Sequence, residues 1–310
     1  MDFVYIIGGL IGLIIGGEYL VRGAVALAQN LRISPMVIGL TLVGFGTSLP
    51  ELVTSVQAAL IGAPGIAVGN VVGSNIANIL LILGCAALIM PLTVPRRAFG
   101  RDGTVLIAAT GLCLGVVLLG TFGRLIGAGF LAFLLGYLIM AIRSGDVAAE
   151  PDLPRATTAP LWPTLAMIAG GLAVTVFAAK FLVQGAVAVA ADLGVSQTVI
   201  GLTIVAIGTS MPELVTSVVA ARRGQIDVAL GNVIGSNLFN LLGILGATAL
   251  INPFAVPSQI VAFDIWVMVA ATVALCAVAV TGWRITRGEG GALIISYAGY
   301  LSYLVWMASS

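Results

Sequence analysis

Residues 44–55 read GFGTSLPELVTS and residues 206–217 read AIGTSMPELVTS, so nearly the same stretch occurs twice, 162 positions apart. Each stretch places proline and glutamate inside a long apolar run. Proline removes a backbone donor and clashes with the preceding turn, so we expect each helix to kink or split beside it. The backbone carbonyls freed around Gly44 and Ala206 would then need partners, and cations are suitable ones.

The composition indicates an integral membrane protein. Of 310 residues, 60% are hydrophobic and 8% are charged, whereas soluble proteins carry about 25% charged residues. The net charge of +1 excludes a polycationic nucleic-acid binder. The chain has no histidine, which excludes imidazole metal sites and histidine proton relays.

Apolar runs long enough to cross a bilayer, about 20 residues each, predict an all-α fold of ten transmembrane helices. The predicted spans lie near 3–27, 35–60, 65–90, 102–120, 122–142, 163–190, 196–220, 226–251, 258–282 and 290–308. The hydrophilic segment 143–160 is predicted to be a cytoplasmic linker. It separates a first five-helix repeat, residues 1–142, from a second, residues 161–310.

The two halves are internal repeats. From Glu18 to Pro91 a shift of 162 keeps register without a gap, and more than half of the positions are identical. Because five spans is an odd number, the second repeat is predicted to be inverted in the membrane. With both termini outside, the external loops carry only Arg124, and the positive-inside rule selects this orientation. The cytoplasmic loops then carry Arg32, Arg96, Arg97, Arg101, Arg143, Arg155, Arg222, Arg223, Arg284 and Arg287. Inverted repeats are typical of alternating-access transporters whose site lies at the repeat interface.

A second polar motif follows each broken helix: GNVVGSNIAN at 69–78 and GNVIGSNLFN at 231–240. Its asparagines and serine recur every four residues and form a polar stripe on one helix face. Hydroxyl, amide, carbonyl and carboxylate oxygens are the ligands of hard cations such as Ca²⁺, which takes about six to eight oxygens. Glu51 and Glu213 match one Ca²⁺ in charge. Two monovalent cations would also neutralise them, so the two ion types should compete.

Simple packing is the alternative explanation of these polar residues. A charged side chain at the bilayer centre costs about 2.5–3.5 kcal/mol or more, so packing does not account for a glutamate beside a helix break in both halves. For Thr54, Ser55, Asn70, Asn75 and their counterparts, a role as polar contacts between helices stays open.

The GTSLPELVTS and GTSMPELVTS stretches, each followed by GNVxGSN, resemble the α-repeats of the Ca²⁺/cation antiporter superfamily, in particular its prokaryotic sodium/calcium exchanger branch. The resemblance covers nearly the whole chain. It implies export of cytoplasmic Ca²⁺ in exchange for external Na⁺ by alternating access, with the first and sixth spans sliding across the site. It also implies a transporter and not an enzyme, in a bacterial or archaeal inner membrane, without a cofactor, nucleic acid or obligatory protein partner. The implied ion ligands are Glu51, Glu213, Thr47, Thr209, Ser48, Ser210, Ser74, Ser236, Asn78, Asn240 and the carbonyls of Gly44 and Ala206.

Two departures from the family pattern bear on coupling. Asn240 stands where some archaeal and potassium-dependent relatives have aspartate, which argues against potassium co-transport. Gly44 replaces an alanine often seen there, which would loosen the first helix break. Proton-coupled relatives usually carry a glutamate soon after the GN pair; its absence here favours Na⁺, with Ca²⁺/H⁺ antiport as the alternative. A passive cation channel and an intramembrane hydrolase are rivals from other classes.

Two opposite charges, Glu18 and Lys180, occupy equivalent positions in the first span of each half. Lone charges are costly inside a membrane, so the two would pair if these spans pack together. The alternative is that Lys180 snorkels or faces water.

Overall fold

The computed structural model describes residues 2–31, 33–62, 64–143, 160–192 and 206–309. The first half contains α1 (Asp2–Leu31), α2 (Pro35–Ile38), α3 (Gly44–Thr47), α4 (Leu49–Leu60), α5 (Pro64–Ala77), α6 (Gly84–Ile89), α7 (Arg96–Leu119) and α8 (Arg124–Arg143). The second contains α9 (Leu161–Asp192), α11 (Ala206–Thr209), α12 (Met211–Arg222), α13 (Ile226–Leu238), α14 (Leu245–Ile251), α15 (Ile265–Val280) and α16 (Arg287–Ser309). Within these described ranges, π-helical segments join or begin the helices: η1 (Gly39–Val43), η2 (Asn78–Leu83), η4 (Phe239–Ile244) and η5 (Ile260–Asp264).

The prediction of an all-α membrane protein is confirmed. Among the described residues, eight helices are long and apolar enough to span a bilayer, and a bent pair, Pro35–Thr47 with Leu49–Leu60, makes up to nine. The span expected near 196–220 is described only from residue 206 onward. The linker 143–160 lies almost entirely outside the described residues.

Each expected helix break occurs at the serine that lies two residues before the proline. The helix axis bends by 44° between α3 and α4, where Ser48 leaves helical geometry at φ −86° and ψ 9°. The second half breaks in the same way at Ser210, between α11 and α12, at φ −91° and ψ 8°. Pro50 and Pro212 then occupy the first turn of the following helix, where the missing N–H is tolerated. The prediction of a break beside each proline is therefore confirmed.

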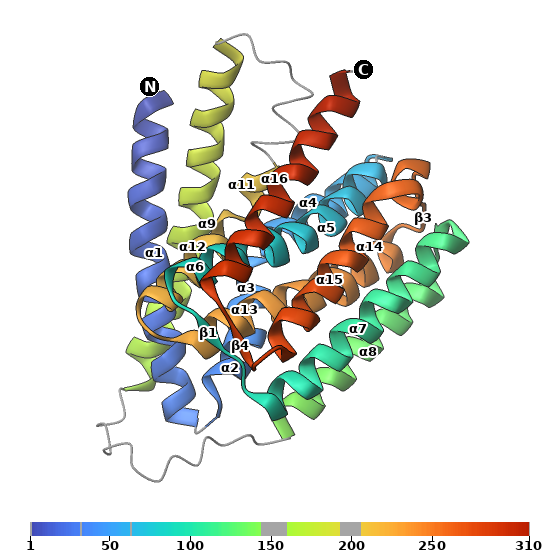
Figure 1. The fold of residues 1–310 in the computed structure, drawn as a ribbon. Coiled ribbons are helices and arrows are strands. Elements are labelled where there is room, and N and C mark those ends of the chain that lie inside the picture. Colours follow the sequence, from blue (N-terminus) through green and yellow to red (C-terminus); the bar gives the residue numbers. More distant parts are fainter. Residues whose placement is uncertain (1, 32, 63, 144–159, 193–205, 310) are drawn as a thin grey trace.

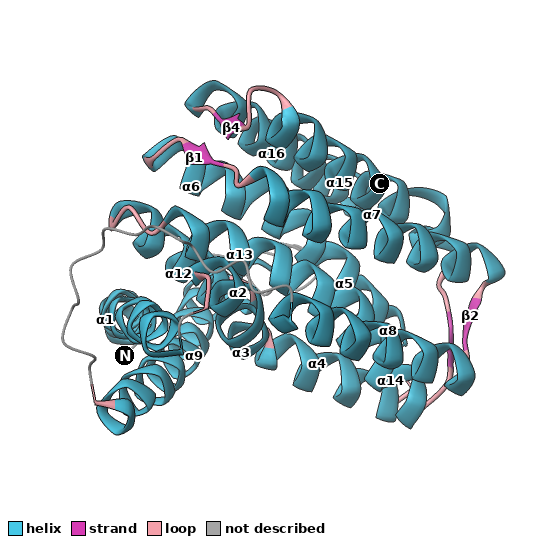
Figure 2. Ribbon diagram, turned by 90° about the horizontal axis from the view of Figure 1, so that it is seen from below, coloured by secondary structure: helices cyan, strands magenta, loops and turns pink. Residues whose placement is uncertain are grey.

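Helices α1 and α9 stand beside each other at one side of the molecule, and the remaining helices form a bundle inclined to them (Figures 1 and 2). Their contacts run in opposite directions along the two helices: Gly9 packs on Ala178, and Gly23 packs on Ile168. A Cβ atom at Gly9 would lie 2.8 Å from the carbonyl oxygen of Ala178. The two helices therefore approach as closely as glycine allows, which is typical of helix packing in membranes.

The antiparallel packing of α1 and α9 shows that the expected Glu18–Lys180 ion pair is wrong. Gly171 packs at the level of Glu18, so Lys180 is nine residues, or about 13 Å, farther along α9 at about 1.5 Å per residue. Glu18 instead pairs with Arg22 at 2.7 Å and with Arg223. Lys180 is exposed.

Two short strand pairs tie the halves together at the helix ends. Strand β1 (Leu92–Thr93) pairs with β4 (Arg284–Ile285), and β2 (Thr121–Phe122) pairs with β3 (Phe254–Ala255), both antiparallel. The largest buried apolar cluster is built from both halves, with α5, η2 and α7 packed against α13, η4 and α15. Within it, the hydroxyls of Thr110 and Thr272, which are 162 positions apart, lie 3.4 Å from each other. Equivalent elements of the two halves thus meet at the centre of the molecule.

Candidate ion-binding site

The two helix breaks bring two buried carboxyl groups into the bundle. Glu51 and Glu213 lie in the first turns of α4 and α12 and are 0% and 1% exposed. Each accepts a hydrogen bond from the serine at the break of the other half. The Ser48 hydroxyl donates to Glu213 Oε1 at 2.7 Å, and the Ser210 hydroxyl donates to Glu51 Oε1 at 3.3 Å. The breaks therefore face each other, and each half completes the site of the other.

The second oxygen of each carboxyl group has no hydrogen-bond partner among the described residues. Glu51 Oε2 and Glu213 Oε2 are both fully buried and unpartnered. Leaving a buried polar atom unsatisfied costs about 1–3 kcal/mol, and more for a charged group. No ion pair to a basic side chain is recorded for either glutamate within the described ranges. Two unneutralised carboxyl groups with free oxygens form a site suited to a cation.

Asn78 and Asn240 also present free polar atoms. They lie within the first two residues of the π-helical segments η2 and η4 and are 1% and 0% exposed. Neither the nitrogen nor the oxygen of either side-chain amide has a partner in the described part of the chain. A π-helical segment widens the helix by one residue and often marks a functional site. These two predicted ligands are therefore buried and free to bind.

The remaining predicted ligands surround the crossed serines. The Ser236 hydroxyl donates to the carbonyl of Gly44 at 3.1 Å, and the hydroxyls of Ser210 and Ser74 lie 3.3 Å apart. Thr47 is buried and donates to the carbonyl of Val43 at 3.0 Å. The expectation of a freed carbonyl at Gly44 is wrong, because this carbonyl still accepts the backbone N–H of Ser48 at 3.3 Å within the helix, in addition to the Ser236 hydroxyl of the other half.

Two predicted ligands are less completely described. Thr209 ends α11, is partly buried and has a polar partner. Ala206 begins α11, and its side chain lies outside the described part.

A pair of asparagines fixes the glutamate-bearing helices in place. Asn232 donates to the carbonyl of Glu213 at 3.2 Å and to the hydroxyl of Ser217 at 2.8 Å. Asn70 makes the matching contacts, to the carbonyl of Glu51 at 3.1 Å and to Ser55 at 2.9 Å. These side chains contact the main chain and a neighbouring hydroxyl, so they act as polar contacts between helices, the alternative that the sequence left open.

Two aspartate–tyrosine contacts were not predicted from the sequence. Asp102 is 0% exposed and accepts hydrogen bonds from Tyr137 at 2.9 Å and Arg101 at 2.6 Å. Tyr300 donates likewise to Asp264 at 3.0 Å. Asp102 and Asp264 are 162 positions apart, whereas Tyr137 and Tyr300 are 163 positions apart. A comparison of the two halves at a fixed shift of 162 therefore aligns the aspartates but not the tyrosines.

A close approach of the halves holds the site together. A Cβ atom at Gly44 would lie 2.9 Å from the backbone nitrogen of Ser236 and 3.2 Å from the carbonyl oxygen of Asn232. Gly235 packs on the carbonyl of Leu40 in the same interface. Side chains at these glycines would separate α3 and η1 from α13, and with them the two breaks.

Comparison with known proteins gives consistent results over the whole chain. The family model described as "Sodium/calcium exchanger protein" matches residues 1–143 and 163–306. The chain is 40% identical to the putative antiporter CaxA of Alkalimonas amylolytica, with 98% of each chain covered. It is 35% identical to the sodium/calcium exchanger MaX1 of Methanosarcina acetivorans, with 99% of each chain covered.

A solved structure of the sodium-calcium exchanger NCX_Mj, soaked with 10 mM Na⁺ and 10 mM Sr²⁺, has the same fold. Its TM-score is 0.86 at 31% identity, and 97% of each chain is covered. The resemblance stated from the repeated motifs is therefore confirmed. The chain is a multi-pass membrane antiporter, a transporter and not an enzyme, and it belongs to the sodium/calcium exchanger family.

Proposed function

We propose that this protein exports Ca²⁺ from the cytoplasm in exchange for external Na⁺, by alternating access of one site built around Glu51 and Glu213. One observation carries the proposal: two buried carboxyl groups meet across the helix breaks, and each keeps an unpartnered oxygen. Ca²⁺ requires several oxygen ligands, and two carboxylates neutralise it. The sodium/calcium exchanger relatives favour Na⁺ as the counter-ion.

The surrounding oxygens extend the site. We propose that Ser48, Ser210, Thr47 and Thr209 and the carbonyls of Gly44 and Ala206 contribute ion ligands, with Ser74 and Ser236 on the outer positions and Asn78 and Asn240 beside the glutamates. The contacts of Ser210 with Ser74 and of Ser236 with the Gly44 carbonyl, together with the unpartnered amides of both asparagines, support this assignment.

We also propose ten transmembrane helices arranged as two inverted repeats, residues 1–142 and 161–310. The antiparallel α1 and α9, the crossed strand pairs and the contact of Thr110 with Thr272 support a twofold relation between the halves. The chain begins and ends on the same side of the molecule (Figure 1), as an even number of spans requires. The arginine distribution favours termini outside the cell, in a bacterial or archaeal inner membrane.

Flux measurements test the function. In proteoliposomes loaded with Na⁺, we expect ⁴⁵Ca²⁺ uptake that collapses when the Na⁺ gradient is removed. Glu51→Gln and Glu213→Gln each remove one negative charge from the site and should reduce uptake to near background. Asp192→Asn is the matched control, because Asp192 is an exposed carboxylate at the end of α9, and its flux should be normal. Near-normal flux in either glutamine variant would remove that glutamate from the mechanism.

The same assay separates the alternatives. Uptake driven equally by a proton gradient without Na⁺ would favour Ca²⁺/H⁺ antiport, and uptake without any opposing gradient would indicate a channel. Orientation is tested by cysteines at Ala149 and Gly194, both outside the described residues, in a background lacking Cys85, Cys113 and Cys276. We expect labelling from opposite sides of the membrane; labelling from one side would contradict the inverted repeats.

A further inference from the structure

Helix α1 contacts the glutamate-bearing helix α12 through small apolar side chains. Gly17 faces Val215 and Val219, and Leu20 and Ala24 belong to the same buried cluster as Val219. Such contacts have no preferred direction. They stabilise the packing of the two helices without a hydrogen bond or an ion pair, because the hydrophobic effect is non-directional.

An ion pair also connects α1 with the end of α12. The Arg223 guanidinium binds both oxygens of Glu18, with Nε donating to Oε2 at 2.6 Å and Nη2 paired to Oε1. Arg22, one turn along α1, binds the same carboxylate at 2.7 Å. Of the ion pairs recorded within the described ranges, Glu18–Arg223 is the one that links residues far apart in the chain, 205 positions.

Arg223 connects this contact to the transport site. It is the C-cap residue of α12, the helix whose first turn carries Glu213. Arg223 is ten positions after Glu213, a distance of about 15 Å along the helix at about 1.5 Å per residue. The Glu18–Arg223 pair therefore holds the α1–α9 layer against the far end of a helix that carries an ion-binding carboxylate.

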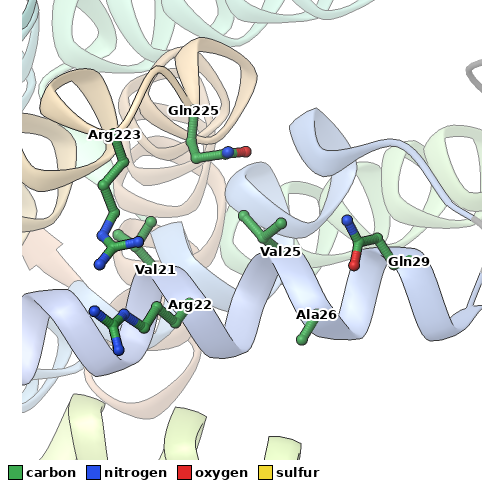
Figure 3. Close-up of a pocket in the computed structure, with 7 residues that line it drawn as sticks. All are labelled: Val21, Arg22, Val25, Ala26, Gln29, Arg223 and Gln225. Atoms are coloured by element: carbon green, nitrogen blue, oxygen red, sulfur yellow. The ribbon is translucent and has the colours of Figure 1, made fainter. Parts of the chain in front are cut away.

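The structure gives this pair room to separate. A cavity of about 190 Å³ lies beside it, lined by Val21, Arg22, Val25, Ala26, Gln29, Arg223 and Gln225. Figure 3 shows Arg223 reaching from the turn after α12 toward Arg22 on α1, with the two glutamines at the side. The side chains of Glu18 and Arg223 are only partly exposed, 31% and 33%. A shift of α1 by one helical turn, about 5.4 Å, would break the pair, and Arg223 could turn into the cavity.

We propose that the Glu18–Arg223 ion pair is a positioning contact that sets the balance between the two access states, by holding α1 on the end of α12 in one of them. The inference rests on the proposed alternating-access function. Neither residue touches the ions. Breaking the pair destabilises the conformation seen here relative to the other, so the carrier spends less time open to one side and more time open to the other.

The apparent affinity on each side reports this balance, since it scales with the fraction of carrier open to that side. Half-saturating Ca²⁺ concentrations are measured in right-side-out and in inverted membrane vesicles. Glu18→Gln and Arg223→Gln should raise this concentration on one side and lower it on the other, so that the ratio of the two concentrations changes by about 1.5- to 5-fold, the range for a partly exposed ion pair. The double variant should match the single variants, because the pair can be broken only once.

Two arginines provide matched controls. Arg22→Gln removes a partner of the same carboxylate within α1, and Arg222→Gln removes the exposed neighbouring charge on α12; both should leave the two concentrations unchanged. Arg223→Lys keeps the charge but loses the paired geometry, so it should give a smaller shift of the same sign and serves if Arg223→Gln lowers expression.

Three results would overturn the inference. These are no shift in Glu18→Gln or Arg223→Gln, a shift in the same direction on both sides, or an equal shift in Arg22→Gln. A wild-type protein without Na⁺-dependent Ca²⁺ flux would instead reject the proposed function, and the two failures are distinct.

Discussion

The crossed serine–glutamate contacts give a sharp test of the site, because the bond has a different length in each half. Ser48 and Ser210 are equivalent residues with nearly the same backbone angles, and neither caps its helix through its side chain. Ser48 donates to Glu213 at 2.7 Å, at the optimum for an O–H···O bond, whereas Ser210 donates to Glu51 at 3.3 Å, beyond the usual range. Ser48→Ala should therefore destabilise the protein more than Ser210→Ala.

The size of the difference follows from known contributions of such bonds. Interhelical hydrogen bonds in membrane proteins contribute about 0.6 kcal/mol on average and at most about 1.7 kcal/mol, while those to charged groups in soluble proteins contribute about 1.5–3 kcal/mol. We expect Ser48→Ala to lower the free energy of unfolding by about 1.5 kcal/mol, since its bond is short and buried. Ser210→Ala should lower it by about 0.5 kcal/mol, because two long contacts are lost.

Unfolding in mixed micelles without Ca²⁺ or Na⁺ measures both variants, since no bound ion then competes for the carboxyl groups. Equal losses in the two variants, or a larger loss in Ser210→Ala, would refute the asymmetric site described here.

Three further predictions follow from other buried polar groups. Asn232→Ala removes two bonds to α12, and Asn70→Ala removes the matching pair to α4; each should lower the free energy of unfolding by about 1 kcal/mol or more, measured in mixed micelles. A loss below about 0.3 kcal/mol would contradict the role of these amides. Tyr137→Phe removes the 2.9 Å bond to buried Asp102 and should lower the melting temperature without changing the half-saturating Ca²⁺ concentration, whereas a changed Ca²⁺ affinity would place this pair in the transport site. Asn240→Asp adds a third carboxyl group to the proposed site, so Na⁺-driven flux in liposomes should become less sensitive to a valinomycin-set potential or more sensitive to pH; unchanged responses to both would place residue 240 outside the site.

The sequence alone determines much of this protein, because the bilayer imposes rules that can be read locally. Long apolar runs must form helices that satisfy their own backbone, and the proline in GTSLPELVTS must interrupt one. Both breaks lie where the sequence predicts them. The repeat carries the polar residues as well as the apolar ones, so the pairing of Glu51 with Glu213 could be inferred without coordinates.

Only the tertiary structure decided which groups touch. The crossed bonds from Ser48 and Ser210 form because the two breaks face each other. This arrangement cannot be predicted from the residue spacing within one segment. The π-helical segments at Asn78 and Asn240 were likewise not predicted from the sequence.

The partners of the charged residues of α1 also could not be predicted from the sequence alone. Glu18 and Lys180 occupy equivalent positions of the two repeats, which differ by a constant shift of 162. Helices α1 and α9 are antiparallel, however, so residue numbers increase along α1 as those of their contacts decrease along α9, and equivalent positions do not meet. Glu18 pairs instead with Arg22 on its own helix and with Arg223 at the end of α12, and the sequence identified Arg223 only as a charged loop residue. Periodicity and repeats specify each helix and its polar face, while the register between helices depends on how closely their glycines allow them to approach.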